Sequence, residues 1–87
     1  MKGNGCVYKN MIEKKVLEIC RKINRDIPED STIRLIDDGY IDSFGVFTIM
    51  AEIEIEYNIL LDDEDMVYEH FKNIKSIVEL VQEKMKG

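Results

Sequence analysis

Residues 43–57 constrain the fold most strongly, because their apolar side chains fall on two opposite sides of a helix. At roughly 100° per residue, the first stripe holds Val46, Ile49, Met50, Ile53 and Tyr57. The second stripe holds Phe44, Phe47, Ala51 and Ile55. A helix that is apolar on both sides is normally covered on both, but an 87-residue chain is too small to wrap one helix completely. We therefore expect the second stripe to stay exposed for a partner.

The start of this helix is marked by two short motifs, Asp38-Gly39 and Asp42-Ser43. Asp-Gly is turn chemistry, and an Asp-Ser pair before an apolar helical run predicts a helix N-terminus, because a side-chain oxygen there can accept from an unpaired backbone N–H. Ser43 is therefore predicted at the mouth of the helix. Its simplest role there is that of an N-cap, and Asp42 favours the positive helix end.

The first helix is predicted from Asn10 to about Asn24. Asn10 with Glu13 three residues later fits a capping box. An apolar stripe at helical spacing follows: Ile12, Val16, Ile19 and Ile23, with Cys20 close by as a core residue. Residues 1–8 are expected to be a flexible tail, and residues 9–87 to be the single folded domain.

The rest of the chain predicts a long loop and two further helices. The loop covers residues 26–42, and three of its apolar residues are expected to pin it to the core: Ile33, Leu35 and Ile36. Asp62 and Asp65 predict a capped, short third helix over about residues 63–70, and its inward side chains are expected to be Met66, Val67 and Phe71. Asn73 predicts the cap of a last helix, with the stripe Ile74, Ile77, Val78, Val81 and Met85. We therefore expect an all-α fold, a bundle of four helices with a long first loop and a short third helix.

Acidic residues are concentrated in the middle of the chain. The net charge is −6, and residues 35–71 hold eleven acids with no lysine or arginine, whereas residues 1–34 hold eight cations against five acids. This field disfavours nucleic acid and attracts enzymes that carry a basic patch. No apolar stretch reaches membrane-spanning length and the first residues lack a signal pattern, so we expect no membrane insertion and a cytoplasmic location.

The segment Gly39-Tyr40-Ile41-Asp42-Ser43-Phe44 resembles the attachment site of phosphopantetheine-dependent carrier proteins, the acyl carrier protein family. The mark of this family is Asp-Ser followed by Leu, Ile or Phe at the start of the second helix, and the resemblance extends over residues 9–85. Asp-Ser-Phe-Gly before an apolar helix with Glu near its end is most similar to D-alanyl carrier proteins and other stand-alone aminoacyl or peptidyl carriers. Gly45 and Thr48 stand where fatty-acid carriers usually have acids, so their full acidic helix is not reproduced.

The resemblance implies a non-catalytic carrier that is expected to be a monomer. Ser43 would bear a 4'-phosphopantetheine arm that holds an acyl or aminoacyl group as a thioester, and Asp42 would be recognised by the transferase. The implied partners are a phosphopantetheinyl transferase, an acyl- or aminoacyl-activating ligase and an acceptor transferase. The implied docking surface is Phe44, Phe47, Ala51, Glu54 and Ile55. The alternative for Phe44, Phe47, Ala51 and Ile55 is packing under the first loop or in a dimer.

The residues themselves exclude other chemistries. A serine is a poor nucleophile without an activating base, the single histidine, His70, is predicted on the far side of the third helix, and there is no Gly-x-Ser-x-Gly elbow. The Asp62-Asp63-Glu64-Asp65 run lacks the glycine and glutamate positions of a calcium loop, so no metal site is predicted. The alternative function is a small acidic helical module that binds basic partners without a prosthetic group, with Ser43 only a helix cap.

Overall fold

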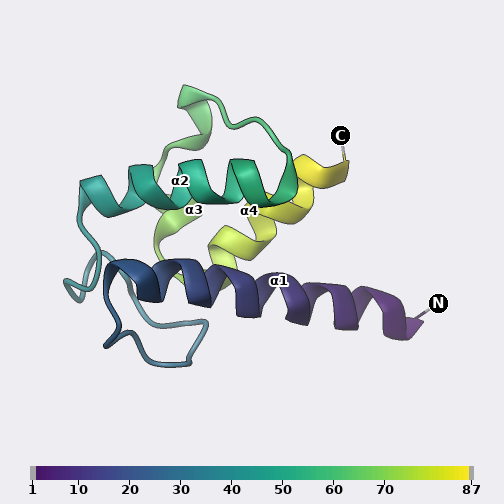
Figure 1. Cartoon of the computed structure of the whole chain (residues 1–87), viewed down its shortest axis with the longest axis horizontal. Helices are drawn as coiled ribbons and strands as arrows, with labels where there is room; N and C mark the ends of the chain where they lie inside the picture. Colours follow the sequence, from purple (N-terminus) through teal and green to yellow (C-terminus); the bar gives the residue numbers. More distant parts are fainter. Residues whose placement is uncertain (1, 87) are drawn as a thin grey trace.

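The computed structural model describes the backbone of residues 2–86 and the side chains of residues 9–86. Its elements in chain order are α1 (Lys2–Ile23), α2 (Ser43–Tyr57), the 3-10 turn η1 (Asp63–Asp65), α3 (Tyr68–Phe71) and α4 (Ile74–Lys86) (Figure 1). Residues 2–86 contain no strand, so the prediction of an all-α fold with a long first loop and a short third helix is confirmed. Among the helices described, none has the length and apolarity needed to cross a membrane.

The core lies where α1, α2 and α4 meet. In Figure 1, α1 and α2 run in opposite directions, and α4 packs against both, while α3 packs on α4. The buried side chains include Ile12, Val16, Ile19 and Cys20 of α1, Ile49 and Ile53 of α2, and Ile74, Ile77, Val78 and Val81 of α4. The predicted inward stripes are therefore confirmed at these positions, and their apolar burial supplies the driving force for folding.

The first helix begins earlier than the sequence predicts. α1 starts at Lys2, so Asn10 lies inside the helix and the predicted capping box with Glu13 is wrong. Residues 2–9 contain no proline, so every N–H beyond the first turn of α1 can join the helical ladder. The side chains of residues 1–8 lie outside the described residues, and the flexibility of this segment stays a prediction.

The predicted continuous third helix over residues 63–70 is wrong, because it divides into η1 and α3. The Asp62 N–H donates to the Asp65 carboxylate at 2.8 Å, so the predicted cap is confirmed, but it closes only one 3-10 turn. Val67 then adopts an extended backbone, which a β-branched residue accepts readily, and the helix cannot continue through it. Val67 is 43% exposed, so its predicted inward position is wrong, whereas Phe71 is buried as predicted.

The long first loop is pinned to the core by its own apolar residues, as predicted. Leu35 is fully buried, and its carbonyl accepts from the N–H groups of Tyr40 and Ile41 at 2.9 and 3.0 Å. Ile33 and Ile36 pack against the core as partly buried residues. These contacts fold the loop back on itself immediately before the start of α2, and they fix where α2 begins.

Candidate functional site

Asp42 caps the first turn of α2. Its backbone is extended, and its carboxylate accepts a 2.9 Å hydrogen bond from the Gly45 N–H, while its carbonyl accepts from the Val46 N–H at 3.1 Å. Ser43 is therefore the first residue of the helix, with an exposed side chain. The predicted helix N-terminus is confirmed, but the reading of Ser43 as its N-cap is wrong, because Asp42 takes that position.

Gly45 holds this turn close to the first loop. A Cβ atom at Gly45 would lie 2.5 Å from the Cγ2 atom of Ile41, which is only 4% exposed. From the sequence, Gly45 stands out only as a departure from the acidic helix of fatty-acid carriers. Its contact with Ile41 shows a local reason for glycine here, since any larger side chain would push the start of α2 away from the loop.

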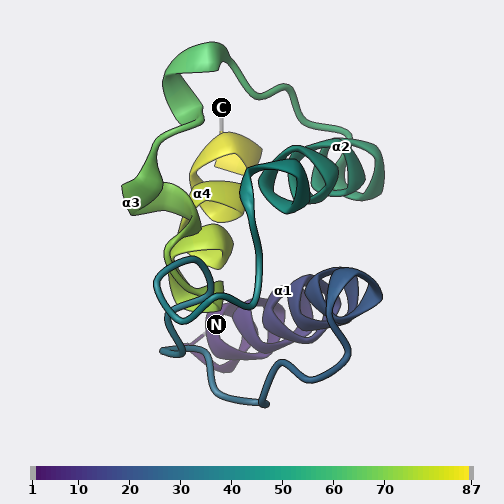
Figure 2. The same ribbon diagram turned by 90° about the vertical axis from the view of Figure 1, so that its left-hand side faces the viewer.

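An apolar groove opens beside Ser43. It has a volume of about 250 Å³ and is lined by Ile36, Ser43, Val46, Met66, Val67, Tyr68 and Phe71. Figure 2 views the molecule from the end at which α2 begins, with α3 and the first loop beside it. Within the described part of the chain, the other lining residues are aliphatic or aromatic, so the Ser43 hydroxyl lies beside a mainly apolar surface. The groove was not predicted, because its walls come from three separate segments.

The second apolar stripe of α2 lies on the surface, as predicted. Phe44, Phe47 and Ile55 are 80%, 56% and 83% exposed, and Ala51 is exposed between them. The alternative that Phe47 and Ile55 pack under the first loop is therefore wrong. An exposed apolar stripe of this kind on a small soluble domain commonly marks an interaction site.

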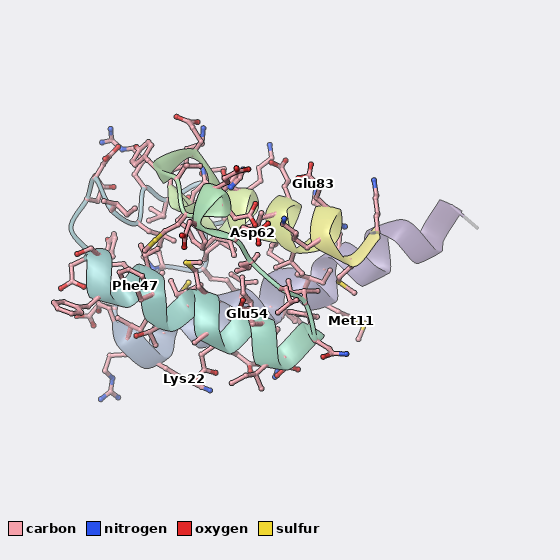
Figure 3. The ribbon with its side chains drawn as sticks, turned by 90° about the horizontal axis from the view of Figure 1, so that it is seen from above. Met11, Lys22, Phe47, Glu54, Asp62 and Glu83 are labelled. Atoms are coloured by element: carbon pink, nitrogen blue, oxygen red, sulfur yellow. The ribbon has the colours of Figure 1, made fainter. Side chains whose placement is uncertain are left out.

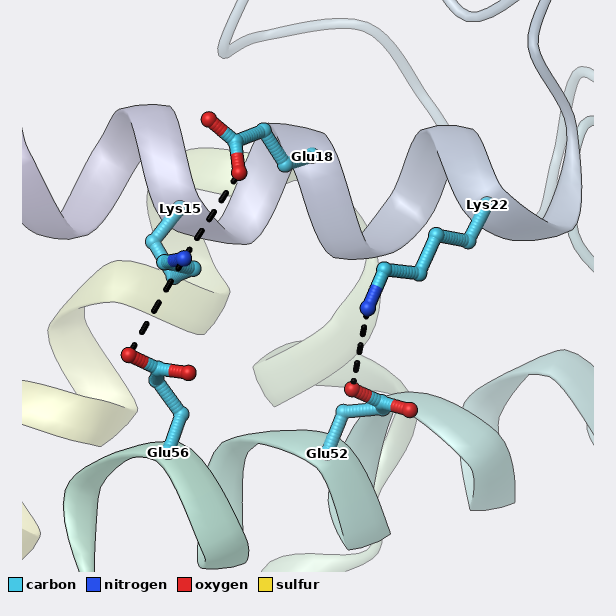
Figure 4. A network of polar contacts seen from close by, with 5 residues as sticks. All are labelled: Lys15, Glu18, Lys22, Glu52 and Glu56. Atoms are coloured by element: carbon cyan, nitrogen blue, oxygen red, sulfur yellow. Dashed lines mark hydrogen bonds and ion pairs between the residues drawn. The ribbon is translucent and has the colours of Figure 1, made fainter.

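Two carboxylates of α2 turn toward α1. Glu52 lies 3.4 Å from the ammonium of Lys22, and Glu56 lies 3.9 Å from that of Lys15, which also contacts Glu18 of its own helix at 3.6 Å (Figure 4). These pairs are partly exposed, so each contributes little to stability. They do place the two α2 acids on the side of the helix that faces α1, away from the exposed stripe.

Glu54, which the resemblance assigns to the docking surface, lies on the opposite flank of α2. Its carboxylate accepts a 2.9 Å hydrogen bond from the Leu61 N–H and so fastens the link that follows α2. In the view of Figure 3, Glu54 and Lys22 lie on opposite sides of α2. The residues between this flank and the α1 side of the helix are uncharged: Phe44, Phe47, Thr48, Ala51 and Ile55. The exposed surface of α2 is therefore more apolar than the sequence suggested.

Polar contacts support the wall of the groove that residues 66–68 form. Lys84 lies 2.8 Å from Asp65, and this ammonium, together with the Asp62 N–H, lowers the pKa of the Asp65 carboxyl. His70 Nδ1 lies 2.9 Å from the Asp65 carbonyl oxygen. The Tyr68 hydroxyl donates to the Asp37 carboxylate, which raises the pKa of Tyr68.

These features define a class of small all-helical proteins that present an exposed serine at a helix start, beside an apolar groove and an apolar stripe. A scan against known protein families gives no match. Among curated proteins, the acyl carrier proteins of Rickettsia canadensis (strain McKiel), Rickettsia rickettsii (strain Iowa) and Rickettsia prowazekii (strain Madrid E) are each 32% identical over 77 residues, which cover 84% of this chain and 85% of theirs. The chain belongs to the acyl carrier protein family, and its role is that of a carrier protein. These relatives do not bear the name of a D-alanyl carrier, so that subtype stays a prediction.

Proposed function

We propose that Ser43 is the attachment site of a 4'-phosphopantetheine arm and that the chain carries an acyl group between partner enzymes. The observation that carries this proposal is the position of Ser43, exposed at the first residue of α2 while Asp42 makes the cap. When bound, the arm supplies a thiol on a flexible tether, and this thiol holds the acyl group as a thioester. The chain itself needs no catalytic group for this role.

The start of α2 suits the phosphate of such an arm. The N-terminus of a helix carries a partial positive charge and backbone N–H groups that favour an anion. Asp42 keeps the first turn closed through the Gly45 N–H, so the Ser43 hydroxyl is held at the tip of the helix. This fit supports attachment at Ser43 and gives Asp42 a positioning role as well as the proposed contact with the transferase.

The groove is better suited to shelter an acyl group than an aminoacyl group. Its lining is apolar apart from Ser43 and the Tyr68 hydroxyl, which is already bonded to Asp37, and an ammonium group would lose its hydration on entering such a surface. An aminoacyl cargo, including D-alanine, would have to keep its charged end in water outside the groove. We therefore propose an acyl group as the cargo, with an aminoacyl group as the second candidate.

The exposed stripe of α2 is the proposed docking surface for the partner enzymes. Phe44, Phe47, Ala51 and Ile55 lie on the same helix as Ser43, so an enzyme that binds them is brought close to the attachment site. Glu54 borders this stripe, although its hydrogen bond to Leu61 gives it a structural role too. The proposed partners are a phosphopantetheinyl transferase, an acyl-activating ligase and an acceptor transferase, acting on a monomer in the cytoplasm.

Intact-mass spectrometry tests the attachment directly. The apo protein is incubated with coenzyme A, magnesium and a broad-specificity phosphopantetheinyl transferase, and its mass should rise by one phosphopantetheinyl unit. Ser43→Ala should abolish the rise. Ser31→Ala is the matched control, because Ser31 lies in the first loop, outside both α2 and the groove lining.

Peptide mapping completes this experiment. The added mass should lie on the peptide that contains Ser43, and circular dichroism should show that Ser43→Ala keeps its helices. A wild-type protein that stays unmodified would contradict the proposal and favour an interaction module without a prosthetic group. Modification that persists in Ser43→Ala would place the arm elsewhere.

A further inference from the structure

The groove beside Ser43 has two walls from distant parts of the chain. Ile36 belongs to the first loop, whereas residues 66–68 comprise the link after η1 and the first residue of α3. Val46 and Phe71 lie at the bottom, with 8% and 2% of their surfaces exposed. The depth and width of the groove are therefore set by how far the first loop and residues 66–68 lie apart.

Two hydrogen bonds at different depths join the first loop to the segment that contains α3. The Leu35 N–H donates to the Lys72 carbonyl at 2.9 Å, and Leu35 is fully buried, so this bond fixes the base of the junction. The Tyr68 hydroxyl donates to the carboxylate of Asp37, which directly follows Ile36. Because Tyr68 and Asp37 are both exposed, their bond closes the walls at the outer rim.

The wall formed by residues 66–68 is held mainly at its ends. On one side, Asp65 is paired with Lys84 of α4 at 2.8 Å, and on the other side Phe71 is buried in the core. Between these anchors, Val67 and Tyr68 are 43% and 45% exposed. A segment with few buried contacts opens at a low free-energy cost, so the bond at the rim governs how easily this wall moves outward.

We propose that Tyr68 and Asp37 form a latch that limits the length of the acyl chain the groove can shelter. This inference rests on the proposed attachment of the arm to Ser43. With the latch closed, the volume of about 250 Å³ lies below the roughly 300–1,000 Å³ of ordinary small-molecule sites, so only a short chain is covered. Without the latch, the wall moves outward and a longer apolar chain is removed from water.

Cleavage of the thioester by hydroxylamine measures this shelter. The protein is loaded at Ser43 from butyryl-, octanoyl- or dodecanoyl-coenzyme A, and the rate of cleavage is recorded for each cargo. Tyr68→Phe keeps the ring that lines the groove and removes only the hydroxyl. We expect the octanoyl thioester of this variant to be cleaved about fivefold more slowly than that of the wild type, the factor that one ordinary hydrogen bond contributes to an equilibrium. The butyryl thioester should be cleaved at the same rate in both.

A second variant and two controls complete the test. Asp37→Ala removes the acceptor and should reproduce the effect of Tyr68→Phe. Tyr40→Phe removes a phenolic hydroxyl from a residue that does not line the groove, and Asp38→Ala removes the neighbouring carboxylate, which contacts Arg34 at 3.3 Å. In both controls, the rate of thioester cleavage should depend on chain length as it does in the wild type. A variant that is merely destabilised would expose all three thioesters alike, so the change in chain-length dependence separates the latch from a general loss of structure.

The outcomes distinguish the latch from the proposed function. If Ser43 accepts no phosphopantetheinyl group from any of the donors, the proposed function fails and the latch fails with it. If the arm loads normally, but each of the three thioesters is cleaved at the same rate in the wild type, Tyr68→Phe and Asp37→Ala, only the latch is overturned.

Discussion

The Gly45 amide donates a 2.9 Å hydrogen bond to the Asp42 carboxylate, and this bond closes the first turn of α2 one residue away from the Ser43 hydroxyl. The structural role and the proposed chemical role therefore belong to two adjacent residues. Asp42 holds the helix end, and Ser43 presents its hydroxyl.

This division predicts that two alanine substitutions change the free energy of unfolding by different amounts. Asp42→Ala removes the cap and should lower the free energy of unfolding by about 1 kcal/mol. Ser43→Ala leaves the cap intact and should change the free energy of unfolding by less than about 0.5 kcal/mol, as is usual for exposed positions. Urea unfolding followed by circular dichroism measures both. A larger loss in Ser43→Ala than in Asp42→Ala would show that Ser43 is the cap after all.

Gly45→Ala should destabilise the protein although alanine is the better helix former. The new Cβ would lie 2.5 Å from the buried Ile41 side chain, and overpacking of this kind costs typically about 1–3 kcal/mol, more than the roughly 1 kcal/mol gained in helix propensity. Thermal unfolding gives the measurement. The double variant Gly45→Ala/Ile41→Val keeps the offending Cγ2 position, so it should not restore stability, whereas Gly45→Ala/Ile41→Ala should recover part of the overpacking loss relative to Ile41→Ala alone.

The buried and exposed faces of the helices could be predicted from the sequence, because the helical period determines which residues share a face. Spacing and chain length alone predict that Phe44 and Ile55 lie on the exposed side of α2, and the structure leaves both exposed. The choice between Asp42 and Ser43 as the cap was not predictable from pattern, since both residue types cap helices well. Only the position of the Gly45 amide decides between them.

The groove and the division of the third helix were beyond the reach of local patterns. Ile36, Val46 and Tyr68 meet only after the chain has folded, and no spacing in the sequence links them. In the third helix, the bond between Asp62 and Asp65 satisfies a single turn, so the same signal serves a 3-10 turn and a longer helix equally well.

The Asp65–Lys84 pair predicts a defined dependence of stability on pH. Its hydrogen bond lowers the pKa of Asp65 below the ordinary value of about 4, so the folded state holds the charged form more strongly than the unfolded state. This stabilisation is complete above about pH 4 and disappears as the pH falls through the lowered pKa. In urea titrations, Asp65→Asn should therefore be less stable than the wild type at neutral pH, and the difference should shrink in acid.

The neighbouring Asp63→Asn is the control for this titration. Asp63 is exposed and belongs to the same turn, so its variant should follow the wild type across the whole range. A difference between wild type and Asp65→Asn that stays constant down to the lowest pH would contradict the role assigned to the pair.

Docking through the stripe of α2 should depend on apolar contact more than on charge. Phe44→Ala and Phe47→Ala remove exposed aromatic anchors and should each lower the kcat/KM of the transferase roughly tenfold, which corresponds to the loss of more than about 1 kcal/mol that marks the important minority of interface residues. Glu52→Gln alters a carboxylate that faces Lys22 and should leave kcat/KM within about twofold, as expected for a weak surface pair. A strong loss in Glu52→Gln, with both phenylalanine variants active, would show that charge guides docking instead.

Cys20 should not react with thiol reagents in the folded protein. The thiol of the proposed arm can therefore be detected as one additional reactive thiol per molecule. The Cys20 side chain is fully buried, and burial raises its pKa to about 12, so at pH 8 roughly one molecule in ten thousand carries the reactive thiolate. In a Cys6→Ser background, the folded apo protein should show no reactive thiol with a disulfide reagent, and treatment with coenzyme A and the transferase should add one. Concentrated guanidinium should expose Cys20 in both forms. A folded apo protein that reacts at once would mean that the core around Cys20 opens readily, because the thiol is otherwise reached only when α1 separates from its neighbours.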